Sequence, residues 1–134
     1  DRGGNLDEAE KMVRHALEAK PESAAFLDSM GWVLLKKGDH PRAIEFLERA
    51  VAAAPDEPTL FEHLGDACIQ GGKRPRAEEA WQRALRLLNE NPDAGERVTQ
   101  RFEIERKLRG IVRRAASRTI APDSRSSLSD SRFH

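Results

Sequence analysis

The sequence predicts an all-α fold, a stack of helical hairpins closed by a C-terminal helix, from three observations. Alanine contributes 18 residues against 13 for Val, Ile and Thr together, and Tyr is absent, which disfavours a sheet. Charged residues of both signs make up 34% of the 134 positions, which is typical of solvent-exposed helices. A 34-residue period also relates two stretches of the chain, within a length that suits one domain.

The period is carried by small and turn-forming residues. Residues 24–57 align on 58–91 and superimpose Gly31 on Gly65, Gly38 on Gly72, Pro41-Arg42-Ala43 on Pro75-Arg76-Ala77, and Arg49-Ala50 on Arg83-Ala84. Backbone geometry restricts where such residues can stand, so their coincidence predicts two copies of one supersecondary unit.

Each unit is predicted to be a helix, a short turn and a second helix. Apolar residues recur at helical spacing on both sides of the turn. Gly38 can adopt the left-handed conformation beyond a helix end, and Pro41 suits the first turn of the next helix. Residues 4–21 match the second helix of a partial first unit, and its apolar residues have no N-terminal neighbour within this chain: Leu6, Met12, Val13 and Leu17. We therefore expect a fragment of a longer array, or a surface covered by another copy.

Residues 92–116 are predicted to form a capping helix, followed by a Ser/Arg-rich tail over 117–134 that cannot bury a core. One arc of this helix is apolar: Ile104, Leu108, Ile111, Val112 and Ala115. The opposite arc is expected to be basic: Arg106, Lys107, Arg109, Arg113, Arg114 and Arg118. From Arg106 onward eight basic and two acidic residues give a net charge of +6. Because the whole chain has a net charge of zero, residues 1–105 carry −6.

The sequence contains no recognisable catalytic, metal or cofactor pattern. The four histidines lie in different units without metal-ligand spacing, and the nucleophile-elbow, Walker and dinucleotide-binding patterns are absent. Cys68 is expected to be a packing residue. We therefore predict a protein that is not an enzyme and has no cofactor. No apolar run approaches the roughly 20 residues that span a bilayer, and no signal peptide is visible, which leaves cytoplasm and bacterial envelope or periplasm open.

Residues 4–91 resemble the tetratricopeptide repeat family. The family positions are occupied by Leu27, Met30-Gly31, Gly38, Ala43, Leu47, Ala50 and Pro55, then by Phe61, Leu64-Gly65, Gly72, Ala77, Trp81 and Ala84, with Asn89 in place of the final Pro. The resemblance implies a right-handed superhelical stack. Small residues would allow close approach of paired helices, with Leu47 and Trp81 filling the space between units. Asp-Ser-Met-Gly-Trp is similar to bacterial repeat proteins, many of them tied to the cell envelope.

The resemblance also implies a concave groove lined by the first helix of each repeat. The corresponding positions here are Ala25, Asp28, Trp32, Leu35 and Lys36, then Thr59, Glu62, Asp66, Ile69 and Gln70. Chaperone-binding members grip a C-terminal carboxylate with Lys and Asn at such positions, whereas this chain has Asp28, Glu62 and Asp66. We therefore predict a neutral or basic partner peptide or helix. Trp32 is interpreted as its anchor, or alternatively as a residue that packs against the preceding unit.

The predicted function is a non-catalytic protein–protein interaction scaffold, and two alternatives stay open. The first is self-association, through the open N-terminal edge or by docking of the tail. The second is an RNA- or anionic-membrane-associated module, with contacts from Arg106, Lys107, Arg109, Arg113 and Arg114. A solvated cap explains the same basic arc, and aromatic residues for base stacking are lacking there. Nucleic acid and membrane are therefore disfavoured as partners.

Overall fold

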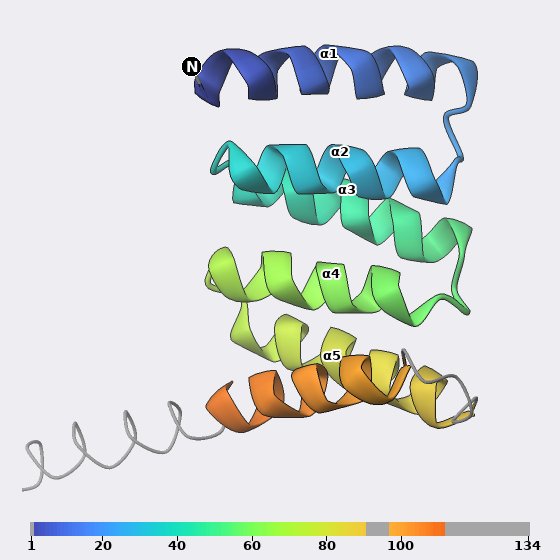
Figure 1. The fold of residues 1–134 in the computed structure, drawn as a ribbon, viewed down its shortest axis with the longest axis vertical. Helices are drawn as coiled ribbons and strands as arrows, with labels where there is room; N and C mark the ends of the chain where they lie inside the picture. Colours follow the sequence, from blue (N-terminus) through green and yellow to red (C-terminus); the bar gives the residue numbers. More distant parts are fainter. Residues whose placement is uncertain (1, 91–96, 112–134) are drawn as a thin grey trace, which may run out of the picture.

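In the computed structural model, which describes residues 2–90 and 97–111, these residues form six helices and no strand. The labelled helices are α1 (Arg2–Ala19), α2 (Ala24–Lys36), α3 (His40–Ala53), α4 (Pro58–Gln70) and α5 (Arg74–Glu90). A further helix spans 97–111. Figure 1 shows the helices stacked one on another from α1 downward, which is the predicted all-α arrangement.

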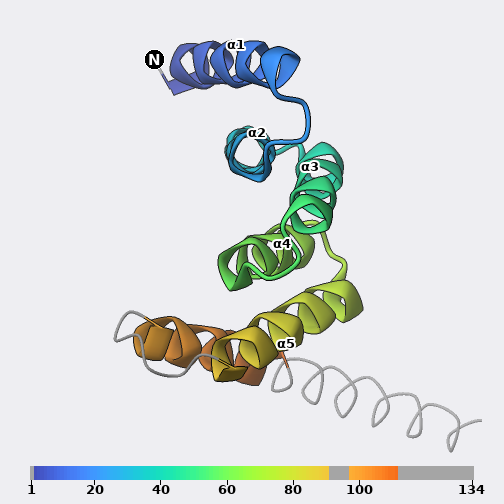
Figure 2. The same cartoon turned by 90° about the vertical axis from the view of Figure 1, so that its right-hand side faces the viewer.

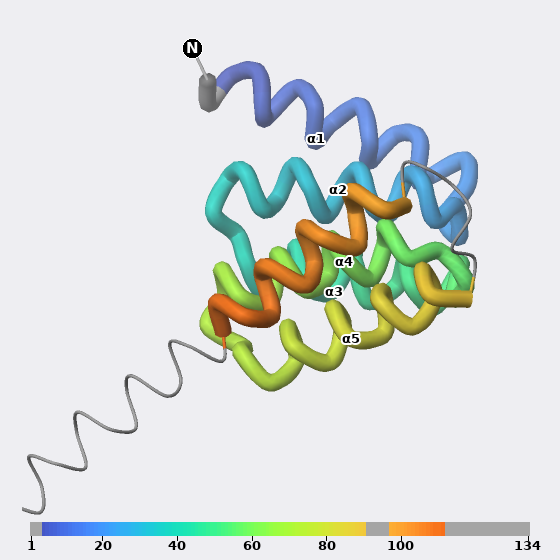
Figure 3. The backbone as a smooth tube through the Cα atoms, turned by 60° about the horizontal axis from the view of Figure 1, so that its bottom comes forward, coloured from blue at the N-terminus to red at the C-terminus, as the bar shows by residue number. Residues whose placement is uncertain are grey.

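The stack is built from two hairpins, α2 with α3 and α4 with α5. They fall within the predicted units, while α1 occupies the position of the partial unit. In Figure 2, α2 and α4 lie on one side of the stack and α3 on the other. The helix at 97–111 returns along α5 and α4 (Figure 3). The rest of the predicted capping helix and the whole tail lie outside the described residues.

Local signals mark the starts and ends of α2 and α3. Ser23 caps α2, its side chain accepting a hydrogen bond from the Phe26 N–H at 3.3 Å, and Asp39 caps α3 by accepting from the Arg42 N–H at 3.3 Å. Gly38 has φ of 86°, in the left-handed region, as does Gly72, the equivalent residue of the next hairpin, at 78°. The predicted turns therefore form as expected.

One continuous core runs through the stack and reaches the last helix through the buried side chains of Ile104 and Ile111. Cys68 is fully buried in this core, as expected for a packing residue. A smaller cluster, Met30 with Leu34 and Ala43, packs against Val13 and Leu17 of α1. The neighbouring Met12 is 72% exposed.

Each hairpin is closed at a glycine. A Cβ atom on Gly31 would lie within 3.0 Å of two Leu47 atoms, and one on Gly65 within 3.0 Å of three atoms of the Trp81 indole ring. Leu47 and Trp81 thus pack against the glycine of their own hairpin. The bare Cα of each glycine leaves space for the large side chain on the partner helix of the hairpin, so the two helices can lie close together.

Among the ion pairs that join neighbouring helices, two groups hold α1 to α2 and α3 to α5. The Lys37 ammonium donates to Asp7 and to the buried Glu10, both at 2.7 Å, and so ties α1 to the end of α2. The Arg76 guanidinium contacts both carboxylate oxygens of Glu48, at 3.1 and 2.6 Å, and ties α5 to α3. Among the described residues, no helix has the length and apolar character needed to span a membrane.

We expect Gly65→Ala to destabilise the protein by about 1–3 kcal/mol, because the new methyl group displaces the Trp81 ring from a packed site. Gly110→Ala is the matched control: apart from its chain neighbours and its own helix backbone, no atom of the described residues lies within 4 Å of the Cβ position, and the substitution should stabilise the helix by about 0.5–1 kcal/mol. Urea unfolding followed by circular dichroism measures both. Equal stability of the two variants would contradict the packing constraint.

Candidate partner-binding groove

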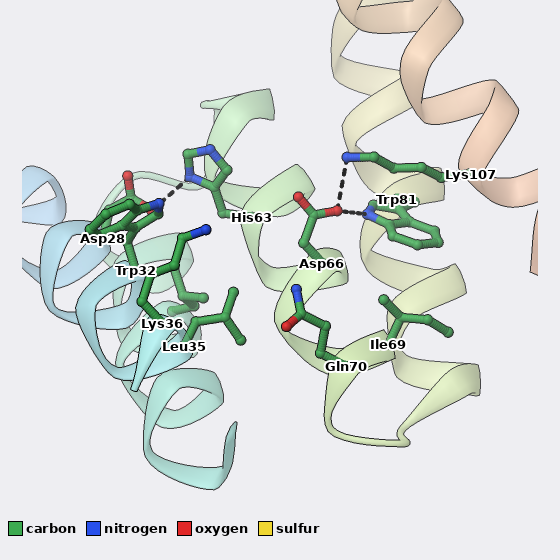
Figure 4. A pocket seen from close by; sticks show the side chains of 11 residues that line it. Asp28, Trp32, Leu35, Lys36, His63, Asp66, Ile69, Gln70, Trp81 and Lys107 are labelled. Atoms are coloured by element: carbon green, nitrogen blue, oxygen red, sulfur yellow. Dashed lines mark hydrogen bonds and ion pairs between the residues drawn. The ribbon is translucent and has the colours of Figure 1, made fainter. Parts of the chain in front are cut away.

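A groove with a volume of about 470 Å³ lies between α2 and α4 and extends to the helix at 97–111 (Figure 4). It is lined by Asp28, Trp32, Leu35, Lys36, Leu47, His63, Asp66, Ile69, Gln70, Trp81 and Lys107. The lining residues of α2 and α4 follow helical spacing, so one face of each helix supplies the wall.

Most of the residues predicted to line a groove do line this one, and three do not. Ala25 is exposed on α2, outside the groove lining. Thr59 and Glu62 are covered by the last helix, where the Gln100 amide donates to the Thr59 hydroxyl at 3.1 Å and to the Glu62 carboxylate at 2.8 Å. The capping helix therefore closes the groove over the first turns of α4.

Trp32 stands in the groove with 54% of its surface exposed. A tryptophan that packed against the preceding unit would be buried, so this exposure favours the anchor interpretation over the packing alternative. The Lys36 ammonium lies 5.4 Å from the centroid of the indole ring, within range of a cation–π interaction. Leu35 and Ile69, both half-buried, add apolar surface to the same groove.

A histidine–carboxylate pair bridges α2 and α4. The distance between His63 Nδ1 and Asp28 Oδ1 is 2.8 Å, and Figure 4 shows the two side chains meeting across the groove. The hydrogen bond to Asp28 raises the pKa of His63 above its ordinary value of 6.5; burial opposes this shift, while Asp66 and Glu62 reinforce it. The imidazolium form of His63 is therefore stabilised in the folded protein.

Asp66 is the shared hydrogen-bond acceptor of a second polar cluster, at the end of the groove next to the helix at 97–111. Its Oδ1 accepts from the Trp81 indole N–H at 3.2 Å and from the Lys107 ammonium at 2.9 Å. Burial raises the pKa of Asp66, and the hydrogen bond from Lys107 only partly offsets this effect. The indole N–H also donates to the Glu62 carbonyl at 3.1 Å, so the packing residue of the α4–α5 hairpin helps to hold this carboxylate.

Lys107 lies on the groove side of its helix, and the prediction that it belongs to the basic arc on the opposite side is wrong. At 100° per residue it is only 60° from the buried Ile104, which aims its side chain at α4. Arg106 and Arg109 are exposed as predicted, and Arg106 pairs with Glu103 at 2.6 Å. The remaining predicted anion contacts, Arg113 and Arg114, lie outside the described residues.

Sequence reasoning missed four lining residues: Leu47, His63, Trp81 and Lys107. The 34-residue period could have indicated His63. It stands 35 residues after Asp28, so it is the residue next to the position that is equivalent to Asp28 in the following repeat. Leu47 and Trp81 were assigned to packing, which they perform, and they also form part of the groove lining. No signal in the sequence pointed to Lys107.

The arrangement suits non-covalent recognition. The groove combines exposed aromatic and aliphatic surface with side chains whose polar atoms are largely paired across helices. Over residues 2–90 and 97–111, no group of three or more His, Cys, Asp or Glu side chains is placed to hold a metal ion. These features define a helical-repeat protein with an open groove.

Two family models described as tetratricopeptide repeat match the sequence, one over residues 1–58 and the other over 34–96. The chain belongs to the tetratricopeptide repeat family, and its fold is the right-handed superhelical stack of that family. No curated protein matches the sequence.

Several solved structures share this fold. SycD, the type III secretion translocator chaperone of Yersinia enterocolitica, has a TM-score of 0.75 at 18% identity, over 86% of this chain and 77% of that chain. PcrH of Pseudomonas aeruginosa, in complex with the chaperone binding region of PopD, has a TM-score of 0.75 at 17% identity, over 85% of this chain and 84% of that chain. The first repeat domain of Spaghetti, bound to an HSP90 peptide, has a TM-score of 0.62 at 20% identity, over 80% of this chain and 82% of that chain.

We expect the His63–Asp28 pair to make stability depend on pH. Because the pKa of His63 is raised by folding, its contribution is fully present below about pH 6.5 and is lost as the pH rises through the folded-state pKa. NMR titration of the His63 imidazole should give a pKa above 6.5 in the wild type and a lower one in Asp28→Asn. An unchanged pKa in that variant would show that the pair does not form in solution.

Proposed function

We propose that this chain is a non-catalytic protein–protein interaction module that binds a segment of a partner protein in the groove between α2 and α4. The observation that carries the proposal is Trp32, a large aromatic side chain that is more than half exposed inside a groove. Tryptophan is enriched among the few residues that dominate protein–protein binding energies. Its apolar neighbours provide the surface around such a contact.

The structures that share the fold support a partner segment as the ligand. PcrH is described in complex with the chaperone binding region of PopD, and SycD in complex with a peptide of the translocator YopD. In both cases the folded repeat stack is paired with a piece of another protein. We infer the same class of ligand for the present groove, an extended or helical segment with a large apolar side chain that contacts Trp32.

The charge of the groove favours a neutral segment among the partners that the sequence left open. Asp28 is paired with His63, and Asp66 is paired with Lys107. A basic partner would have to compete with these internal donors, which already satisfy the carboxylates. Burial of apolar surface is thus the main source of affinity in this proposal.

We expect Trp32→Ala to weaken binding by about thirtyfold or more, the loss of roughly 2 kcal/mol that defines a hot-spot residue, with helicity nearly unchanged. Peptides selected from a phage-displayed library on the wild-type protein would be titrated against both proteins by fluorescence anisotropy. Selected peptides that bind the variant equally well would refute Trp32 as the anchor.

The control separates binding from folding. Trp81→Ala removes the other tryptophan, which is 3% exposed and packs on Gly65. We expect it to lower stability by about 3–5 kcal/mol, as for other buried aromatic truncations. If Trp32→Ala also loses helicity, then Trp32 is a core residue and the assignment of the groove fails.

A further inference from the structure

Of the described residues of the capping helix, 97–111, Lys107 alone is among the lining residues of the groove. Its ammonium lies 3.0 Å from Glu62 Oε2 and 2.9 Å from Asp66 Oδ1, and 5.8 Å from the centroid of the Trp81 ring. The two carboxylates come from successive turns of α4, and all three charged side chains are partly buried. Figure 4 shows Lys107 reaching toward Asp66 beside the indole.

This geometry is a site for a single cation. Two carboxylates four residues apart on one helix repel each other, and their partial burial increases the cost of leaving them unpaired. One ammonium or guanidinium placed between them relieves both penalties, and the aromatic face of Trp81 adds a favourable electrostatic contact. The chain fills this site with its own lysine, from a position 41 residues away from Asp66.

We propose that Lys107 determines the charge specificity of the groove: by occupying the cation site formed by Glu62 and Asp66, it excludes the Lys and Arg side chains of partner segments from that site. The groove then accepts uncharged apolar segments and discriminates against basic ones. This inference rests on the proposed function for its biological meaning, but the cation site itself can be tested without a partner.

The groove contains a second lysine that serves as a matched control. Lys36 has no carboxylate within 4.0 Å in the part of the chain that the structure describes, and its ammonium lies over the Trp32 ring instead. Lys36→Gln therefore removes the same charge from the same groove and leaves the cation site filled. Lys107→Gln removes that charge and vacates the site.

The experiment titrates acetyl-arginine-amide, a small guanidinium probe, into each protein and follows the Trp81 indole resonance by ¹H–¹⁵N NMR. The Trp81 N–H donates to Asp66, so its resonance reports on the site directly. We expect Lys107→Gln to bind the probe about tenfold or more tightly than the wild type and than Lys36→Gln, the gain expected from one charge-assisted hydrogen-bonded pair. Identical titrations for all three proteins would overturn the proposal.

Two further variants control for folding and for the identity of the site. Lys107→Met keeps the alkyl chain beside Trp81 and should show the same gain if Lys107→Gln is too unstable to study. A triple variant removes the carboxylates as well as the lysine: Glu62→Gln/Asp66→Asn/Lys107→Gln. It should bind acetyl-arginine-amide no more tightly than the wild type does. Probe binding that persists in this triple variant would place the cation elsewhere and contradict the proposal.

A peptide experiment distinguishes this inference from the proposed function. Library peptides selected on the wild type are resynthesised with one Arg replacing a Gln or Ala at each position in turn. We expect the Arg peptides to bind wild type more weakly and Lys107→Gln more tightly than their parents.

If no peptide binds any variant while the NMR response appears, the proposed function fails and the cation site stands. Parent peptides that bind wild type without any Arg-dependent gain in Lys107→Gln would refute the specificity role alone.

Discussion

Two glycines in the middle of α2 and α4 set how closely the helices of each hairpin can approach. Gly31 and Gly65 leave space that Leu47 and Trp81 occupy, so each hairpin closes around one large side chain. The same close packing brings the indole N–H of Trp81 to the edge of the groove, where it donates to Asp66. The contact that stabilises the hairpin therefore also orients a charged residue of the candidate site.

The groove depends on charges that are balanced within the chain. Asp28 meets a histidine of the next repeat, and Asp66 meets a lysine of the capping helix. Pairing of this kind gives each partly buried carboxylate a hydrogen-bond partner within the chain, and it leaves Trp32 as the exposed aromatic side chain of the groove. In the function that we propose, recognition follows shape and apolar contact, and charge acts mainly to reject basic segments.

The capping helix has two roles: it extends the core of the stack, and it supplies side chains that contact α4. Ile104 and Ile111 extend the core, which protects the apolar face of the last hairpin from water. Gln100 and Lys107 then reach back to α4, covering Glu62 and filling the space beside Asp66. One amphipathic helix thereby ends the repeat stack and forms one end of the groove.

The sequence by itself determined the repeat and the turns, because these follow from helical periodicity and from local backbone chemistry. The groove-facing positions of α2 and α4 came from the resemblance to the tetratricopeptide repeat family. Trp32 and Asp66 were located through this resemblance. Only the tertiary structure decided the partners of the charged side chains. Lys107 is 45 and 41 residues from Glu62 and Asp66, and it shares no repeat period with them. Such pairs depend on how the last helix lies across the stack, which is set by the packing of the core and not by local sequence.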